Sequence, residues 1–189
     1  MLQSPAVTTS QMWLATVLAA VIDIGIASLL WKRASRERFA RLSWWFACVA
    51  GIQWACIYGV AALAAWDSCY RYVMPPWVRW AAWIYGLGHV LLALVFWWIV
   101  MHVRTRPVIA LAILGGLHSL PGHLNGIYAR HLLEACPLVR GISPGSALIF
   151  GAFEFAFYWM MALTLSMALQ RIATGRGGMV QPPHSAARP

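Results

Sequence analysis

The chain has 189 residues, of which 61% are hydrophobic and only 10% are charged. Soluble domains carry roughly 25% charged residues, so a chain this poor in polar groups cannot cover its apolar surface in water. The net charge of +9 does not indicate a nucleic-acid partner, because ten of the 14 Lys and Arg residues flank apolar runs, at Lys32–Arg41, Arg104–Arg106 and from Arg171 onward. That distribution is typical of membrane proteins, whose basic loops lie in the cytoplasm.

The apolar runs predict an all-α, polytopic membrane protein with a bundle of five transmembrane helices. A helix needs about 20 predominantly apolar residues to cross a bilayer. One membrane domain is expected over residues 11–172, with no separate soluble domain. Its predicted spans are 11–31, 42–65, 77–102, a kinked 108–124, and 146–170.

The fourth span is the weakest of the five. Its apolar run reaches only Leu120 before Pro121-Gly122 interrupts it, about 13 residues against the 20 required. It either continues as a kinked helix through His123–Ala135 or forms a re-entrant segment. We favour the kinked crossing, because the fifth span is clear and the Arg171 that follows it is expected in the cytoplasm.

The basic loops predict an N-terminus outside and a C-terminus inside the cell. Residues 1–10 carry no basic side chain, which suits an extracytoplasmic segment, and residues 173–189 are expected to form a disordered cytoplasmic tail. A signal peptide is excluded for residues 1–31, since the charges follow the apolar run instead of preceding it. The expected location is a bacterial inner membrane.

Each predicted span carries one polar side chain at a similar depth, and we expect the five to share one intramembrane pocket. They lie roughly 12 to 18 Å below the extracytoplasmic surface, counted by the helical rise. Polar groups at such depth usually face the bundle interior; the alternative role is hydrogen bonding between helices. Two carboxyls and two imidazoles would allow acid–base catalysis. The candidate catalytic residues are Asp23, Glu154, His89 and His118, and Gln53 is the fifth polar residue.

The sequence predicts no metal ion and no cofactor. No two His residues share a helical face at a spacing of four, and His118 and His123 are five apart with Pro121 between them.

Four cysteines divide into two pairs. Cys69 and Cys136 fall in predicted extracytoplasmic loops, where they form either a disulfide or two free thiols. No CxxC motif is present, which argues against a thiol-redox enzyme. Cys48 and Cys56 are expected to be small core residues of the second span.

Several stretches resemble the EXPERA group, which includes the emopamil-binding sterol 8,7-isomerases and the sigma-two-type receptors. Arg41–Ile52, RLSWWFACVAGI, is similar to the isomerases' RLS…WFA…GFI stretch, and Asp67–Tyr72, DSCYRY, is similar to their DSRY with two residues inserted. From Tyr72 the spacings to Arg106-Pro107, to Ile127-Tyr128 and to Trp159 are also close to theirs. The resemblance covers about residues 40–170 and implies a five-helix fold.

The resemblance does not carry over the isomerases' acid–base residues. Their His on the second helix corresponds to Gln53, and their Glu to Ile57, with Tyr58 beside it. Their acidic residue on the third helix corresponds to Trp83 or one of its apolar neighbours, while their Asn and Trp on the last helix correspond best to Glu154 and Trp159. The resemblance therefore implies a different lipid reaction, or ligand binding alone.

Three functions remain open at this point. The first is an enzyme or binding protein for an apolar lipid, sterol or isoprenoid, an isomerase or cyclase of lipid metabolism, with Gln53, Tyr58, Trp159 and His123 contacting the substrate. The second is a small transporter or channel, although no internal repeat supports it. The third is an accessory subunit of a membrane complex; a homo-oligomer is also possible.

Overall fold

The computed structural model describes residues 7–175, and every regular element in this range is a helix. Five helices are long and apolar enough to cross a membrane: Thr9–Leu30, Ser43–Ala64, Val78–His102, Pro107–Ala129 and Pro144–Ala173. The chain is therefore built as a multi-pass membrane protein. Residues 1–6 and 176–189 lie outside the described range, and with them most of the predicted N-terminal segment and of the predicted tail.

The first two spans are uninterrupted α-helices joined by a short basic helix. Helix α1 (Thr9–Leu30) begins at a capping box, in which the Thr8 side chain accepts from the Gln11 backbone amide and the Gln11 side chain accepts from the Thr8 amide. Helix α2 (Arg36–Ala40) follows, and α3 (Ser43–Ala64) forms the second span. Phe39 of α2 is fully buried, and its carbonyl accepts a hydrogen bond from the Trp97 indole at 3.1 Å. The short helix is thus packed against the end of the third span.

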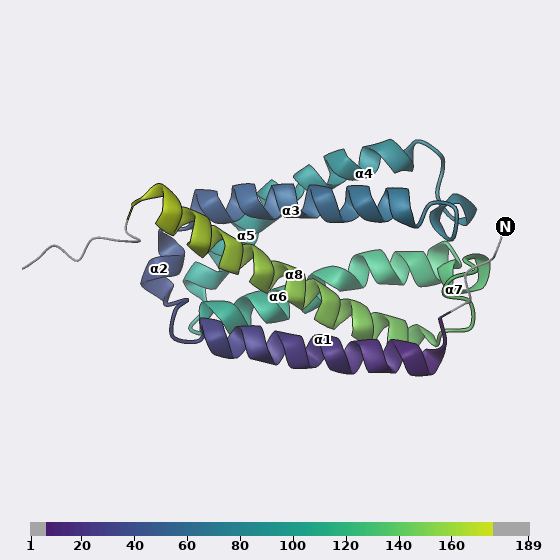
Figure 1. Cartoon of the computed structure of the whole chain (residues 1–189), viewed down its shortest axis with the longest axis horizontal. Helices are drawn as coiled ribbons and strands as arrows, with labels where there is room; N and C mark the ends of the chain where they lie inside the picture. The colour runs from purple at the N-terminus through teal and green to yellow at the C-terminus, as the bar shows by residue number, and fades with distance from the viewer. Residues whose placement is uncertain (1–6, 176–189) are drawn as a thin grey trace, which may run out of the picture.

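The third span consists of two helices that meet at a glycine. Helix α4 (Val78–Leu87) ends at Gly88, and α5 (His89–His102) continues in the same direction. A 3₁₀ turn, η1 (Tyr70–Tyr72), lies in the loop that leads into α4. Figure 1 shows α4 lying along α3, on the opposite side of the bundle from α1.

The fourth span is longer than its apolar run. Helix α6 (Pro107–Leu124) passes through Pro121 without ending, and the π-helical turn η2 (Asn125–Ala129) extends it. Pro121 has no amide to donate to the preceding turn, yet its carbonyl accepts from the Asn125 amide, so the helix resumes directly after it. The span reaches 23 residues, long enough for the crossing that we favour, and it ends five residues beyond the predicted end at residue 124.

The fifth span packs at the centre of the bundle. A short helix, α7 (Leu132–Ala135), precedes α8 (Pro144–Ala173), which contacts α1, α3 and α6. Helices α6 and α8 approach closely at Gly115, where an added Cβ would lie 2.9 Å from the Ala156 Cα. Small residues at such seams allow helix backbones to come together in a membrane.

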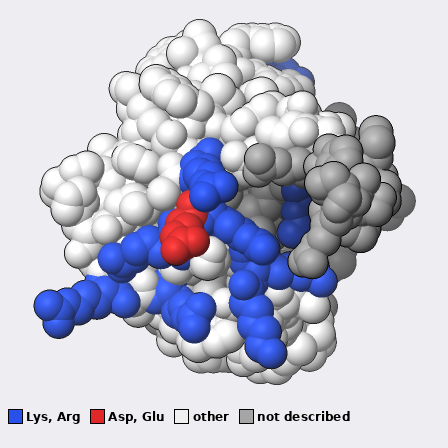
Figure 2. Space-filling model, turned by 90° about the vertical axis from the view of Figure 1, so that its left-hand side faces the viewer, with Lys and Arg blue, Asp and Glu red and all other residues white. Residues whose placement is uncertain are grey.

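One end of the bundle is strongly basic (Figure 2). It contains the end of α1, α2, the α5–α6 loop and the end of α8 (Figure 1). These segments contain eight cationic side chains and a single carboxylate, that of Glu37. The cations are Lys32, Arg33, Arg36, Arg38, Arg41, Arg104, Arg106 and Arg171.

Candidate functional site

Aromatic side chains from four spans meet around Trp54 in the middle of the bundle. We refer to them as the Trp54 cluster. Trp54 is fully buried, and its ring lies 4.8 to 5.7 Å, centroid to centroid, from each of six other rings. The six are Tyr58 of α3, His89 of α5, His118 of α6, and Phe155, Tyr158 and Trp159 of α8.

His89 enters the cluster because α4 lies unusually close to α3. An added Cβ at Gly86 would lie 2.5 Å from the Ala55 nitrogen and from the Trp54 carbonyl oxygen, so only glycine permits this approach. The His89 ring stacks on Trp54 at 4.8 Å with an interplanar angle of 22°. Its Nδ1 lies 3.1 Å from the Gly86 carbonyl oxygen and 3.3 Å from that of Tyr85. Because both of these carbonyl oxygens are acceptors, the proton of the neutral imidazole is on Nδ1, and Nε2 has a free lone pair.

His118 has the opposite tautomer. The Trp159 indole Nε1–H donates to His118 Nδ1 at 3.2 Å, so in the neutral imidazole the proton is on Nε2. The centroids of the His89 and His118 rings are 5.1 Å apart. The cluster therefore contains one imidazole whose Nε2 can accept a proton next to one whose Nε2 can donate.

Gln53 and Glu154 lie at the edge of the cluster, connected through Tyr158. The Gln53 amide donates from Nε2 to the Tyr158 carbonyl at 2.7 Å. The Tyr158 hydroxyl donates to Glu154 Oε1 at 2.8 Å. Burial raises the pKa of the Tyr70 hydroxyl, in the loop before α4. Glu154 lies ten residues after Pro144, in the half of α8 that is farther from the basic end.

His123 extends the same side of the site by about one helical turn. Its Nδ1 lies 2.9 Å from the Ser119 carbonyl oxygen, and its ring is 5.6 Å from that of Phe155. The imidazole occupies the space that a side chain at Gly151 would need. Sequence-predicted residues from α3, α5, α6 and α8 are thus brought together, with Glu154 and His123 on one side.

Three buried polar atoms of this site have no hydrogen-bond partner in the described structure. They are the His89 Nε2 lone pair, the Trp54 Nε1–H and the Gln53 Oε1. Buried polar atoms in folded proteins are nearly always paired, and leaving one unpaired costs about 1 to 3 kcal/mol. Two acceptors and a donor without partners, all at one cluster, indicate a site suited to the polar part of a ligand. Residues 7–175 contain no group of three His, Cys, Asp or Glu side chains able to hold a metal ion.

Asp23 does not belong to this cluster, which corrects the prediction of a single pocket. It lines a separate groove between α1, α6 and α8, together with Ala152 and Ala156 of α8. Glu154 and Tyr158 lie on the opposite side of α8, because at 100° per residue they are about half a turn away from those alanines. Asp23 and Glu154 were predicted at a similar depth in the membrane, but they lie on different sides of α8 and do not line one pocket.

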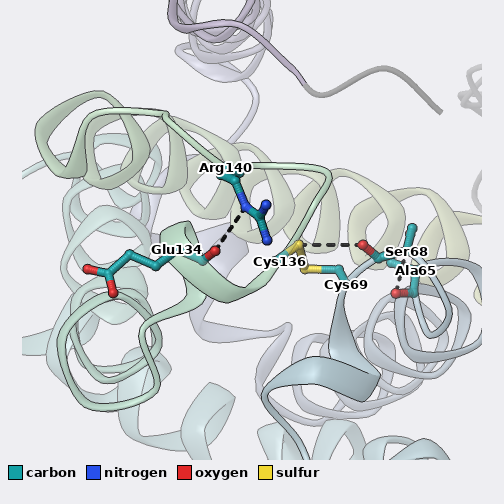
Figure 3. The surroundings of a disulfide bond; sticks show 6 residues. All are labelled: Ala65, Ser68, Cys69, Glu134, Cys136 and Arg140. Atoms are coloured by element: carbon teal, nitrogen blue, oxygen red, sulfur yellow. Dashed lines mark hydrogen bonds between the residues drawn. A yellow bond between two sulfur atoms is a disulfide. The ribbon is translucent and has the colours of Figure 1, made fainter. Parts of the chain in front are cut away.

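The predicted cysteine pair is joined in the structure. Cys69, in the loop after α3, and Cys136, after α7, form a disulfide with a Cα–Cα distance of 4.6 Å (Figure 3). Both cysteines are buried, and the Arg140 Nε beside them donates to the Glu134 carbonyl at 3.1 Å. The bond ties the α3 side of the bundle to the α6 side at the end opposite the basic end (Figure 1).

The other two cysteines correct a prediction. Cys48 and Cys56 were expected in the core, but both are exposed on α3. They share one outward face with Ile52 and Val60, at spacings of four residues, while Gln53 and Trp54 face inward.

The central residue of the site, Trp54, was not among the predicted site residues. Most of the Trp residues lie near span ends, where they anchor the interface. Trp54 lies eleven residues into α3, about 16 Å from the helix end, and this depth is the signal that could have distinguished it. No protein-family model, curated protein or solved structure matches the chain.

Proposed function

We propose that this protein binds an apolar lipid, sterol or isoprenoid at the Trp54 cluster and transfers protons to and from it. The observation that carries the proposal is the set of three unpartnered polar atoms, on His89, Trp54 and Gln53, inside a wall of aromatic rings. The polar group of a ligand could donate to the Gln53 Oε1 and accept from the Trp54 Nε1–H, which leaves His89 Nε2 free, and its apolar body could lie against the rings.

The depth of the cluster limits the class of ligand. Trp54 lies about 16 Å from the start of α3, so the ligand must dissolve in the hydrocarbon region of the membrane. Flat aromatic faces pack well against unsaturated or ring-containing molecules, and they attract cations through the ring quadrupole. The EXPERA resemblance favours the same ligand class and forms part of this proposal.

The chemistry we propose is the migration of a double bond. Glu154 gives its proton to one alkene carbon, and the electron pair of the double bond forms the new C–H bond. The faces of Trp54 and Trp159 stabilise the resulting carbocation. His89 Nε2 then removes a proton from the neighbouring carbon, which restores a double bond one position away, and that proton returns to Glu154.

The membrane orientation is a second part of the proposal. The eight cations at one end of the bundle favour the cytoplasmic side for that end, with the N-terminus outside and the C-terminus inside. The disulfide would then lie on the oxidising side, as expected for a bacterial inner-membrane protein.

Purification in mild detergent, followed by mass spectrometry of the extracted molecules, tests the binding part. Wild-type protein and Glu134→Gln, which changes an exposed carboxylate of α7, should carry the same molecule that is not a phospholipid. Gln53→Leu should lose it, because the polar group of the ligand no longer has the Oε1 acceptor. Equal recovery from Gln53→Leu and wild type would overturn the binding site.

Deuterated buffer tests the proton transfer. The extracted molecule, returned to wild-type protein, should gain carbon-bound deuterium, because the proton that Glu154 delivers exchanges with solvent. Glu154→Gln should slow incorporation by about 10² to 10⁴-fold, whereas Glu134→Gln should not. If wild-type protein binds the molecule without incorporating deuterium, the acid–base chemistry is refuted.

A further inference from the structure

A second site lies on the membrane-facing side of the bundle, between α1, α6 and α8. It is a groove of about 500 Å³, within the 300 to 1,000 Å³ typical of small-molecule sites. Small residues of α6 and α8 form part of it, among them Gly116, Ala152 and Ala156. Larger side chains, including Ile24, Ile113 and Phe153, border it and are exposed toward the membrane.

Asp23 is the one polar residue that lines this groove. Its side chain is only 7% exposed, and neither carboxyl oxygen has a hydrogen-bond partner within the described residues. A carboxyl group without a partner inside a membrane costs several kcal/mol. The groove thus combines apolar walls with an acceptor that lacks its donor.

The depth of Asp23 limits which molecule can supply that donor. Asp23 lies seven residues before Leu30, the last residue of α1, about 10 Å from that end of the helix. Phospholipid headgroups lie outside the hydrocarbon region, and acyl chains at this depth carry no hydrogen-bond donor. The donor must therefore belong to a molecule that dissolves in the hydrocarbon region.

The size of the groove argues against a helix from a second protein chain. Along α8 the groove extends from Ala152 to Met160, about 12 Å. A helix about 10 Å across would occupy about 900 Å³ over that length, nearly twice the volume present. A single hydrocarbon chain fits this space better.

We propose that the groove binds a long-chain alcohol dissolved in the membrane, whose hydroxyl donates a hydrogen bond to Asp23. The tail lies along the small residues of the α6–α8 seam. The groove shares no lining residue with the Trp54 cluster, and Glu154 and Tyr158 lie on the opposite side of α8 from Ala152 and Ala156.

Binding of tritiated geranylgeraniol to the purified full chain in phosphatidylcholine nanodiscs tests the proposal. Unlabelled geranylgeraniol should displace the probe, whereas the corresponding hydrocarbon without the hydroxyl should compete at least tenfold more weakly. Asp23→Leu should weaken binding about tenfold, the equivalent of one lost hydrogen bond. Asp23→Asn keeps an acceptor oxygen and should stay close to wild type.

Two further variants separate a filled groove from a damaged fold. Ala152→Leu fills the groove and should also weaken binding about tenfold, whereas Ala64→Leu, exposed at the end of α3, should not. Gln53→Leu should leave alcohol binding unchanged, because Gln53 does not line the groove, so failure at the Trp54 cluster would be distinguishable.

Three results would overturn the proposal. They are equal competition by the hydrocarbon, full binding by Asp23→Leu, and a second copy or partner chain cross-linked into the groove.

Discussion

The close approach of α4 to α3 at Gly86 leads to a quantitative prediction. A Cβ added there would lie 2.5 Å from the Ala55 nitrogen and from the Trp54 carbonyl oxygen, whereas non-bonded heavy atoms prefer about 3.5 to 4.0 Å. The obstructing atoms belong to the backbone, so no rotamer change relieves the clash, and α4 must move away by about 1 Å. Overpacking costs typically 1 to 3 kcal/mol; we expect Gly86→Ala to lower the free energy of unfolding by about 2 to 3 kcal/mol.

The same displacement should disturb the candidate site. His89 follows Gly86 by three residues, and its ring stacks on Trp54, whose carbonyl is part of the clash. Gly86→Ala should therefore also reduce recovery of the bound molecule in the purification experiment described above.

Reversible unfolding by SDS in mixed micelles, followed by tryptophan fluorescence, measures the stability change. Gly25→Ala is the matched control, since no atom lies within 4 Å of its added Cβ, and it should stay within about 0.5 kcal/mol of wild type. If Gly86→Ala unfolds at the same SDS fraction as Gly25→Ala, the close helix packing is refuted.

Two more predictions concern the disulfide and the orientation. Cys69→Ser with Cys136→Ser opens a loop closed across 67 residues and should cost about 2 to 4 kcal/mol in the same assay. Cys48→Ser with Cys56→Ser, which changes exposed thiols, should cost less than about 0.5 kcal/mol; equal midpoints for the two double variants would contradict a structural role for the disulfide. A green fluorescent protein fused to the C-terminus should fluoresce and an alkaline phosphatase fused there should be inactive, because the basic end is expected in the cytoplasm. An active phosphatase would reverse the proposed orientation.

The membrane spans were predictable because they depend on local properties. Length and hydropathy are read along the chain, and four predicted spans differ from the observed helices by no more than three residues at either end. The fourth was underestimated, because its helix passes through Pro121 and ends in the π-helical turn at Ala129. This end of the span packs against α8, where Ile127 lies in one apolar cluster with Ala147, and such packing is not visible in hydropathy.

The candidate site was only partly predictable. Depth along each helix identified His89 and His118 as partners, and the structure places their rings 5.1 Å apart. The depth of a residue does not specify the rotation of its helix about the helix axis. These helices are apolar on nearly every side, so the hydrophobic periodicity did not identify the face that points into the bundle. For this reason Asp23 was grouped with residues that lie on the other side of α8.

By itself, the sequence determined that the chain is a membrane protein, how many helices cross the membrane, and which two cysteines could form a disulfide. It did so because burial in lipid and the helical rise act on each segment separately. Only the tertiary structure decided that Trp54 is the centre of the aromatic site and that Asp23 lines a groove of its own. Both depend on how helices rotate and approach one another, as at Gly86 and Gly115, where the absence of a side chain sets the distance between spans.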